Sequence, residues 1–233
     1  MKHYYALFSG GVDSALAVLK IMKQQQSIRI TPLFFDYGQK AAHKEEEAVA
    51  KLIPLLRELA GQNNVVLEDY LKYEIGGTDL FLWSKSSILK GREDTAKPDL
   101  ENRNMILISI AVSIIMSARN EEATSKTKKR RGLIVGFKNE HYDTKRRFAA
   151  RLNKVIGQGD FLMEIITPLV QDEERVGARA LARTMQEMGA NRILSYAWSC
   201  YCPTLDGSRC KTCTTCKSRC KLENELRTRI KRK

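Results

Sequence analysis

The sequence has no cysteine in its first 199 residues; all six cysteines lie between Cys200 and Cys220. A scaffold held together by disulfides spreads its bridges over the fold, so this distribution argues against a secreted, disulfide-bonded protein. Cysteines that gather at one end of a chain are instead typical of a metal site. We therefore expect a bound metal near the carboxyl end of the chain.

Long apolar runs are also missing. No uninterrupted stretch approaches the roughly 18 residues that a membrane-spanning helix needs, and the opening MKHYYALFSGG reaches a glycine pair before a signal-peptide pattern develops. The hydrophobic fraction of 43% is ordinary for a globular protein, which argues against extensive disorder. We expect a cytoplasmic protein with no membrane association.

Acidic residues are fewer than basic ones, 27 against 40, which gives a formal net charge of +13. Such a chain can bind nucleic acid, a nucleotide or an acidic partner protein. Much of the excess lies in residues 126–131 and 227–233, and short runs of this kind are more often solvated loops or tails. The charge alone therefore does not identify the partner.

Short apolar runs alternate with longer runs of helical periodicity. They predict strands at residues 4–8, 28–35, 65–71, 132–137 and 164–167, and helices at 14–22, 43–59, 105–118, 148–155 and 175–188. This alternation indicates an α/β fold with a parallel sheet and helices on both faces. We expect one domain at 1–195, with an exposed basic insertion at about 120–131, and a cysteine module with a basic tail at 196–233.

The six residues Ser9–Ser14, SGGVDS, stand between a predicted strand and a predicted helix. Glycines let the backbone turn tightly and aim amide groups into one concavity, where the helix N-terminus adds partial positive charge. Phosphate is the natural occupant, and Asp13 can approach it through Mg²⁺. A Walker loop is excluded because no Gly-Lys-Ser/Thr ending follows. The simpler alternative is a plain turn capped by Ser9.

Cys210, Cys213 and Cys216 recur at three-residue spacing, and Cys200 offers a fourth thiolate. Four thiolates can surround a tetrahedral zinc ion, and because they leave no open position the metal would be structural. An iron–sulfur cluster uses similar spacings and stays an alternative. Cys220 can replace one of the four ligands.

The SGGVDS string resembles the SGGxDS signature of the PP-loop ATP-pyrophosphatases, which cleave ATP to AMP and pyrophosphate. Four further segments resemble one branch of that superfamily, the QueC (7-cyano-7-deazaguanine synthase) family. They are FDYGQ at 35–39, NRN at 102–104, TPL at 167–169, and WSCY at 198–201 with the cysteines behind it. The resemblance implies an adenine-nucleotide α-hydrolase-like (Rossmann-like) fold with a C-terminal zinc module, and a homodimer.

By the same resemblance, the enzyme is an ATP-dependent carbon–nitrogen ligase. It adenylates the carboxylate of 7-carboxy-7-deazaguanine, and a nitrogen nucleophile then gives the amide and, with a second ATP, the nitrile. The implied ATP and Mg²⁺ site is Ser9, Gly10, Gly11, Val12, Asp13, Ser14 and Phe35; the implied substrate site is Tyr37, Gln39, Arg103, Asn104 and Asp143. The expected catalytic residues are Asp13, Ser14, Arg103 and Arg175. The expected ligands of Zn²⁺ are Cys200, Cys210, Cys213 and Cys216.

Two regions depart from the QueC pattern. Residues 139–147, NEHYDTKRR, replace a GYPDCR-like stretch, and the lysine expected after TPL is missing, which leaves only Arg175 to supply its charge. These changes concern the second chemical step more than adenylation. An alternative is therefore a QueC-like paralogue of an anti-phage system (type IV CBASS-like) that joins the deazaguanine to an amine or N-terminus of a partner protein.

Two other functions are weaker. A tRNA-modifying PP-loop enzyme would fit the positive charge, but no RNA-binding domain and no aromatic–basic platform is visible, so we do not expect nucleic acid as a partner. A zinc-stabilised scaffold with an inactive loop is disfavoured because Asp13 and both serines are intact.

Overall fold

The computed structural model describes residues 1–61, 64–75, 89, 102–121, 131–137, 146–156, 163–170 and 177–230. Six strands form one sheet: β1 (Lys2–Leu7), β2 (Ile28–Asp36), β3 (Val65–Leu67), β4 (Leu71–Glu74), β5 (Arg131–Ile134) and β6 (Met163–Ile166). The helices are α1 (Val12–Gln24), α2 (Ala42–Ala60), α3 (Arg103–Glu121), α4 (Arg146–Ile156), α5 (Ala178–Glu187), α6 (Ile193–Tyr196) and α7 (Thr214–Ile230). Strands and helices alternate as the sequence predicts.

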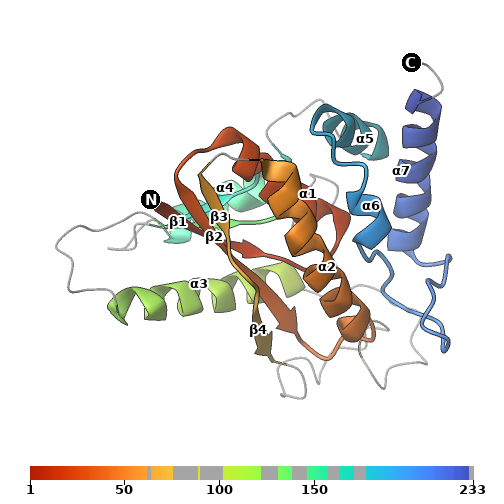
Figure 1. Cartoon of the computed structure of the whole chain (residues 1–233). Coiled ribbons are helices and arrows are strands. Elements are labelled where there is room, and N and C mark those ends of the chain that lie inside the picture. The colour runs from red at the N-terminus through yellow and green to blue at the C-terminus, as the bar shows by residue number, and fades with distance from the viewer. Residues whose placement is uncertain are drawn as a thin grey trace.

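The strand order is β3-β2-β1-β5-β6, and every neighbouring pair is parallel. The chain moves outward from β1 to β2 and β3, then crosses over to β5 on the other side of β1 (Figure 1). The order of the strands therefore reverses beside β1. In open α/β sheets, ligands bind at such a switch point, outside the carboxyl ends of the strands.

One predicted strand, at 65–71, is two strands. β3 pairs with the first part of β2 and β4 with its last part, Leu33–Asp36. Between them stand Glu68 and Asp69, and acidic residues are poor strand formers. The extended stretch consequently breaks there, although the amide of Glu68 still donates to the carbonyl of Ile30.

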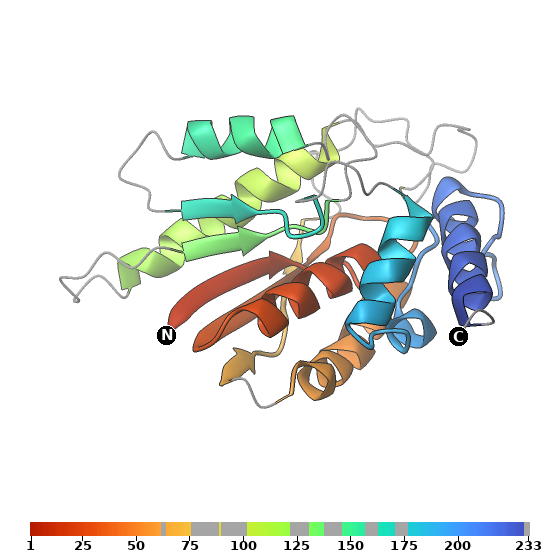
Figure 2. The ribbon, with the colours of Figure 1, turned by 90° about the horizontal axis from the view of Figure 1, so that it is seen from above.

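Two apolar layers cover the sheet because successive side chains of a strand point to opposite faces. Tyr4 and Ala6 of β1 face the layer of α1 and α2, whereas Tyr5 faces the layer of α3 and α4. Figure 2 shows α3 and α4 on one side of the strands and α1 and α2 on the other. The α/β class expected from the sequence is confirmed.

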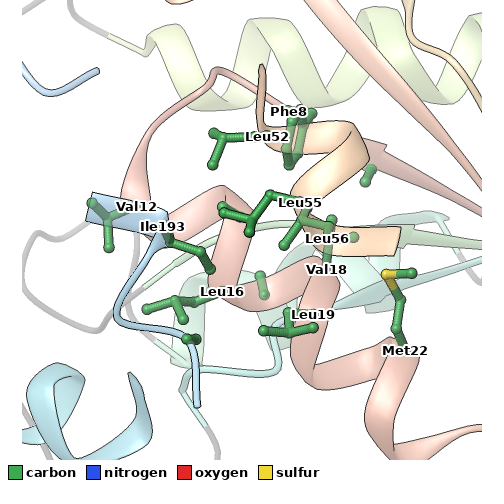
Figure 3. Packing of buried hydrophobic residues seen from close by; sticks show 14 of the residues in the cluster. Phe8, Val12, Leu16, Val18, Leu19, Met22, Leu52, Leu55, Leu56 and Ile193 are labelled. Atoms are coloured by element: carbon green, nitrogen blue, oxygen red, sulfur yellow. The ribbon is translucent and has the colours of Figure 1, made fainter. Parts of the chain in front are cut away.

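The layer of α1 and α2 is the larger core. Leu16 and Leu19 of α1 are fully buried against Leu52 and Leu56 of α2, and Ile193 of α6 closes the cluster (Figure 3). Each such side chain contributes about 1.5–3 kcal/mol of hydrophobic stabilisation. This packing fixes α1, and therefore the loop that precedes it, against the sheet.

The carboxyl-terminal segment contains a helix that the sequence analysis did not predict. This helix is α7, whose Leu222 and Leu226 are buried in the core that contains α1 and whose last turn carries the basic Arg227 and Arg229. The division of the chain at residue 195 stays a prediction. A smaller difference is the start of α5, which begins at Ala178 because Gly177 has a φ of +89°. None of the helices in the described part of the chain is long and apolar enough to cross a membrane.

Candidate functional site

The SGGVDS loop follows β1 at the switch point. Gly10 has a φ of +71°, and a Cβ atom there would lie 2.5 Å from the carbonyl oxygen of Glu45 and 3.0 Å from Ala48 Cβ. Only glycine fits this position. The first turn of α2 thus packs directly on the back of the loop.

A second glycine, Gly136, lets the end of β5 approach the same loop. A Cβ atom at Gly136 would lie 2.7 Å from the backbone nitrogen of Ser14 and 2.8 Å from the carbonyl carbon of Asp13. Sequence analysis missed this residue because the contact joins positions more than 120 residues apart. Its only signal is a glycine near the end of the predicted strand 132–137.

The loop leads directly into the first turn of α1. The N-cap residue is Gly11, which has no side chain that could cap this end, so Ser9 is not the N-cap residue. Ser9 is exposed and Asp13 is half-buried, whereas Gly10 and Val12 are buried. The hydroxyl of Ser14 donates to the carbonyl of Gly11 at 3.0 Å. Amide groups of an uncapped helix N-terminus can bind a phosphate.

The end of β2 forms the second part of the site. Phe35 and Tyr37 are 6% and 8% exposed and belong to the core beneath α3. The Gln39 amide is fully engaged: it donates to the carbonyl of Phe35 at 3.1 Å and to Glu45 at 2.9 Å, and it accepts from the amide of Tyr37 at 2.8 Å. Gln39 therefore shapes the turn after β2, and its substrate role stays a prediction.

Glu45, in the first turn of α2, is a residue that sequence analysis missed. Burial raises its pKa to about 7, and the charge of Asp36 acts in the same direction, while the hydrogen bond from Gln39 and the charge of Arg103 oppose it. Perturbed carboxyl groups of this kind concentrate at functional sites. The signal that could have revealed it is an acidic residue opening the helix after FDYGQ.

Arg103 is the first residue of α3, and Asn104, which is half-buried, follows it. The guanidinium carbon of Arg103 lies 5.7 Å from the ring centroid of Tyr201. Burial opposes the charge, but the oxygens of Tyr37 and Tyr201 outweigh it and raise the pKa of Arg103. A permanent cation therefore lies at the carboxyl end of β2, among residues from three distant parts of the chain.

The four predicted cysteines come together as expected. The sulfur atoms of Cys200, Cys210, Cys213 and Cys216 all lie within 4.8 Å of one another. The Cys200–Cys210 and Cys210–Cys216 sulfur distances are 3.6 Å and 4.0 Å. Tetrahedral zinc with Zn–S bonds of about 2.3 Å places its sulfurs about 3.8 Å apart. These residues fit a structural zinc ion.

The four cysteines differ in how easily they ionise when no cation is bound. Burial opposes ionisation of Cys210, but hydrogen bonds from Thr212 and from the amide of Cys213 lower its pKa to about 6. Burial raises the pKa of Cys216 to about 11 and that of Cys200 still further. Only a bound cation would hold all four as thiolates at neutral pH.

The cysteine segment contacts the loop directly. The amide of Trp198 donates to the carbonyl of Gly10 at 2.9 Å, and the indole of Trp198 donates to the carbonyl of Cys200 at 2.9 Å. Arg219 of α7 donates to the carbonyl of Ala197 at 2.8 Å.

Two predicted site residues, Asp143 and Arg175, lie outside the described residues, as do 122–130 of the basic insertion.

The fold and the site define an α/β protein with a glycine-rich loop at the switch point and a group of four cysteines near the carboxyl end that could hold a metal ion. The family model of the queuosine biosynthesis protein QueC matches residues 4–225, and the chain belongs to this family. The family predicted from the sequence motifs is thereby confirmed.

Several relatives are similar over nearly their whole length. The 7-cyano-7-deazaguanine synthase of Campylobacter concisus is 27% identical over 231 residues, covering 94% of this chain and 92% of that protein. The 7-cyano-7-deazaguanine synthase of Pyrococcus horikoshii is 25% identical over 237 residues, covering 93% and 90%. A 4-thiouridine synthetase solved with RNA and bound ATP has 16% identity and a TM-score of 0.47; the match covers 97% of this chain and 54% of that one.

Proposed function

We propose that this protein is an ATP-dependent enzyme that adenylates the carboxylate of 7-carboxy-7-deazaguanine and transfers it to nitrogen. The product is the amide and then the nitrile, 7-cyano-7-deazaguanine. The observation that carries the proposal is the glycine-rich loop Ser9–Ser14, which leads into the amino end of α1 at the switch point, in a chain that belongs to the QueC family. The names of the relatives, 7-cyano-7-deazaguanine synthases, support the substrate.

In the first step, a carboxylate oxygen of the substrate forms a bond to the α-phosphorus of ATP. The bond from that phosphorus to the bridging oxygen breaks, and pyrophosphate leaves. Negative charge gathers on the leaving group, and the first-turn amides of α1 would stabilise it. Asp13, half-buried in the same turn, would hold Mg²⁺, which supplies further positive charge to the phosphates.

Arg103 is suited to a bound anion. A guanidinium presents parallel N–H groups that match a phosphate or carboxylate in a bidentate arrangement. In the described part of the chain it is hydrogen-bonded to Tyr37 and Tyr201, and its charge also acts on the buried carboxyl group of Glu45. We assign Arg103 to the α-phosphate or to the carboxylate that attacks it.

In the second step, ammonia attacks the acyl carbon. A carbon–nitrogen bond forms, the carbon–oxygen bond to AMP breaks, and the nitrogen loses a proton, which gives the amide. A second ATP activates the amide oxygen in the same way, and loss of AMP and a proton gives the nitrile. The predicted homodimer and the predicted acidic partner protein stay predictions beside this proposal.

Product analysis tests the proposal. The protein is incubated with ATP, Mg²⁺ and 7-carboxy-7-deazaguanine, with and without ammonium, and the products are identified by mass. We expect pyrophosphate release that depends on the acid, and a nitrile that depends on ammonium. AMP release without amide or nitrile would favour transfer to a protein amine instead, and no acid-dependent pyrophosphate would reject the proposal.

A further inference from the structure

Tyr201 joins two groups of residues that are far apart in the sequence. Its neighbour Cys200 belongs to the four-cysteine site, is 1% exposed and accepts a hydrogen bond from the amide of Cys210. Its ring faces the guanidinium of Arg103, with 5.7 Å from Cζ to the ring centroid. The backbone that carries the ring is therefore fixed by the cysteines.

The contact suits a guanidinium that has to bind an anion. An aromatic face attracts the cation through its flat side, and the hydroxyl groups of Tyr201 and Tyr37 accept hydrogen bonds from the guanidinium without cancelling its charge. A carboxylate in the same place would use the N–H groups of the guanidinium and cancel the charge. Tyr37 adds its phenol oxygen from the end of β2, and the two tyrosines together outweigh the burial of Arg103 and keep it charged.

The segment 198–201 also contacts the loop Ser9–Ser14. The amide of Trp198, three residues before Tyr201, donates to the carbonyl of Gly10. Figure 1 shows α6 and the chain that follows it beside α1 and α2, and α6 contacts both of these helices. Residues 198–201 thus contact both the loop and the cation of the candidate site.

We propose that Tyr201 is a positioning residue that orients Arg103 toward the bound anion and makes this orientation depend on the metal-loaded cysteine site. The proposal rests on the proposed function only where it assigns an anionic ligand to Arg103. The packing of Tyr201 against Arg103, and its dependence on the cysteines, stand apart from that function. A kinetic experiment tests the effect of Tyr201 on Arg103 in the reaction, and a second experiment, which needs no activity, tests the packing and its dependence on the cysteine site.

The first experiment is kinetic. Tyr201→Phe keeps the ring face, whereas Tyr201→Leu removes it; a lost cation–π contact lowers kcat by about 3–30-fold. We expect that loss in the leucine variant, with the KM for ATP changed less than about twofold, and recovery of most of kcat in the phenylalanine variant. Tyr196→Leu is the matched control, because Tyr196 contacts Arg192 at the surface.

A double-mutant cycle shows whether Tyr201 acts through Arg103. In an Arg103→Gln background, Tyr201→Leu should cost no further activity, within about twofold, because the cation it orients is gone. An equal loss in both backgrounds would show that Tyr201 supports the fold alone. That outcome would overturn the proposal.

The second experiment needs no activity. Hydrogen exchange is measured at residues 103–110, the first turns of α3, in the intact protein, after metal removal by a chelator, and in the variants. We expect faster exchange there in Tyr201→Leu and in the metal-free protein, and no change in Tyr196→Leu. Unchanged exchange in both would overturn the proposal even if the proposed function holds. Should Tyr201→Leu lose its metal, Tyr201→Met, which has no ring face, replaces it.

Discussion

The backbone amide of Trp198 donates a hydrogen bond to the carbonyl oxygen of Gly10, with 2.9 Å between nitrogen and oxygen. The bond ties the cysteine segment to the loop at the amino end of α1, across almost the whole sequence. Since Gly10 is also pressed against the first turn of α2, three elements meet at one residue. The loop is therefore held from several sides before any ligand arrives, and such preorganisation favours binding.

Replacing Gly10 by alanine tests this packing. The new methyl group would lie 2.5 Å from a backbone oxygen in a strained, left-handed conformation, so we expect a loss of about 1–3 kcal/mol in the free energy of unfolding. Gly61→Ala is the matched control: its φ is +70°, but nothing lies within 4 Å. Urea denaturation of both variants separates the clash from the strain. Equal losses in the two would contradict the packing of α2 on the loop.

The pKa of Glu45 predicts a pH-dependent stability. Burial raises this pKa from its ordinary 4.5 to about 7, so the folded state favours the protonated form. The stabilisation is complete below pH 4.5 and is lost as pH rises to about 7. In Glu45→Gln, which keeps an acceptor for Gln39, the Tm should therefore fall less between pH 5 and pH 8 than in the wild type. Parallel Tm curves for the two proteins would show that Glu45 has an ordinary pKa.

Features that depend on residues close together in the sequence could be predicted, whereas features that depend on contacts between residues far apart in the sequence could not. The loop at Ser9–Ser14 and the four cysteines are local patterns, and the strands β1 and β2 each contain a short apolar stretch; each was predictable within a few residues. The helix α7 was not, because only Leu222 and Leu226 give its charged sequence an apolar face.

Contacts between distant segments were beyond a reading of local patterns. Gly136 lies against Ser14, and the ring of Tyr201 lies against Arg103. The first contact forms because the crossover of the parallel sheet brings β5 beside β1. The second forms because the carboxyl-terminal segment returns to the site. Glu45 was invisible for a related reason. Its pKa depends on burial, which is a property of the folded chain.

The metal site can be tested with cysteines inside and outside the cluster. Cys210→Ser removes one of the four sulfurs, so zinc measured by elemental analysis should fall well below one per chain and the Tm should drop. Cys220→Ser is the matched control because Cys220 is exposed and lies outside the four-sulfur group. Iron with sulfide in the purified protein would establish a cluster instead of zinc. An unchanged zinc content in Cys210→Ser would remove that residue from the ligand set.

We expect the guanidinium of Arg103 to donate two parallel hydrogen bonds to its anion and not merely to supply a positive charge. Arg103→Gln should lower kcat/KM by about 10–100-fold, since a hydrogen bond between charged groups is lost. Arg103→Lys keeps the charge without the planar fork, so it should restore only part of that loss. Steady-state kinetics of the two variants measures the difference. Full activity in either variant would exclude a bidentate role.

The most direct test of the account is pyrophosphate release by variants of the loop. Asp13→Asn and Ser14→Ala are compared with Lys23→Gln, an exposed position in the last turn of the same helix, at matched protein stability. The account predicts that acid-dependent pyrophosphate release falls at least about tenfold in the two loop variants and stays unchanged in Lys23→Gln. Wild-type rates in both loop variants would contradict it.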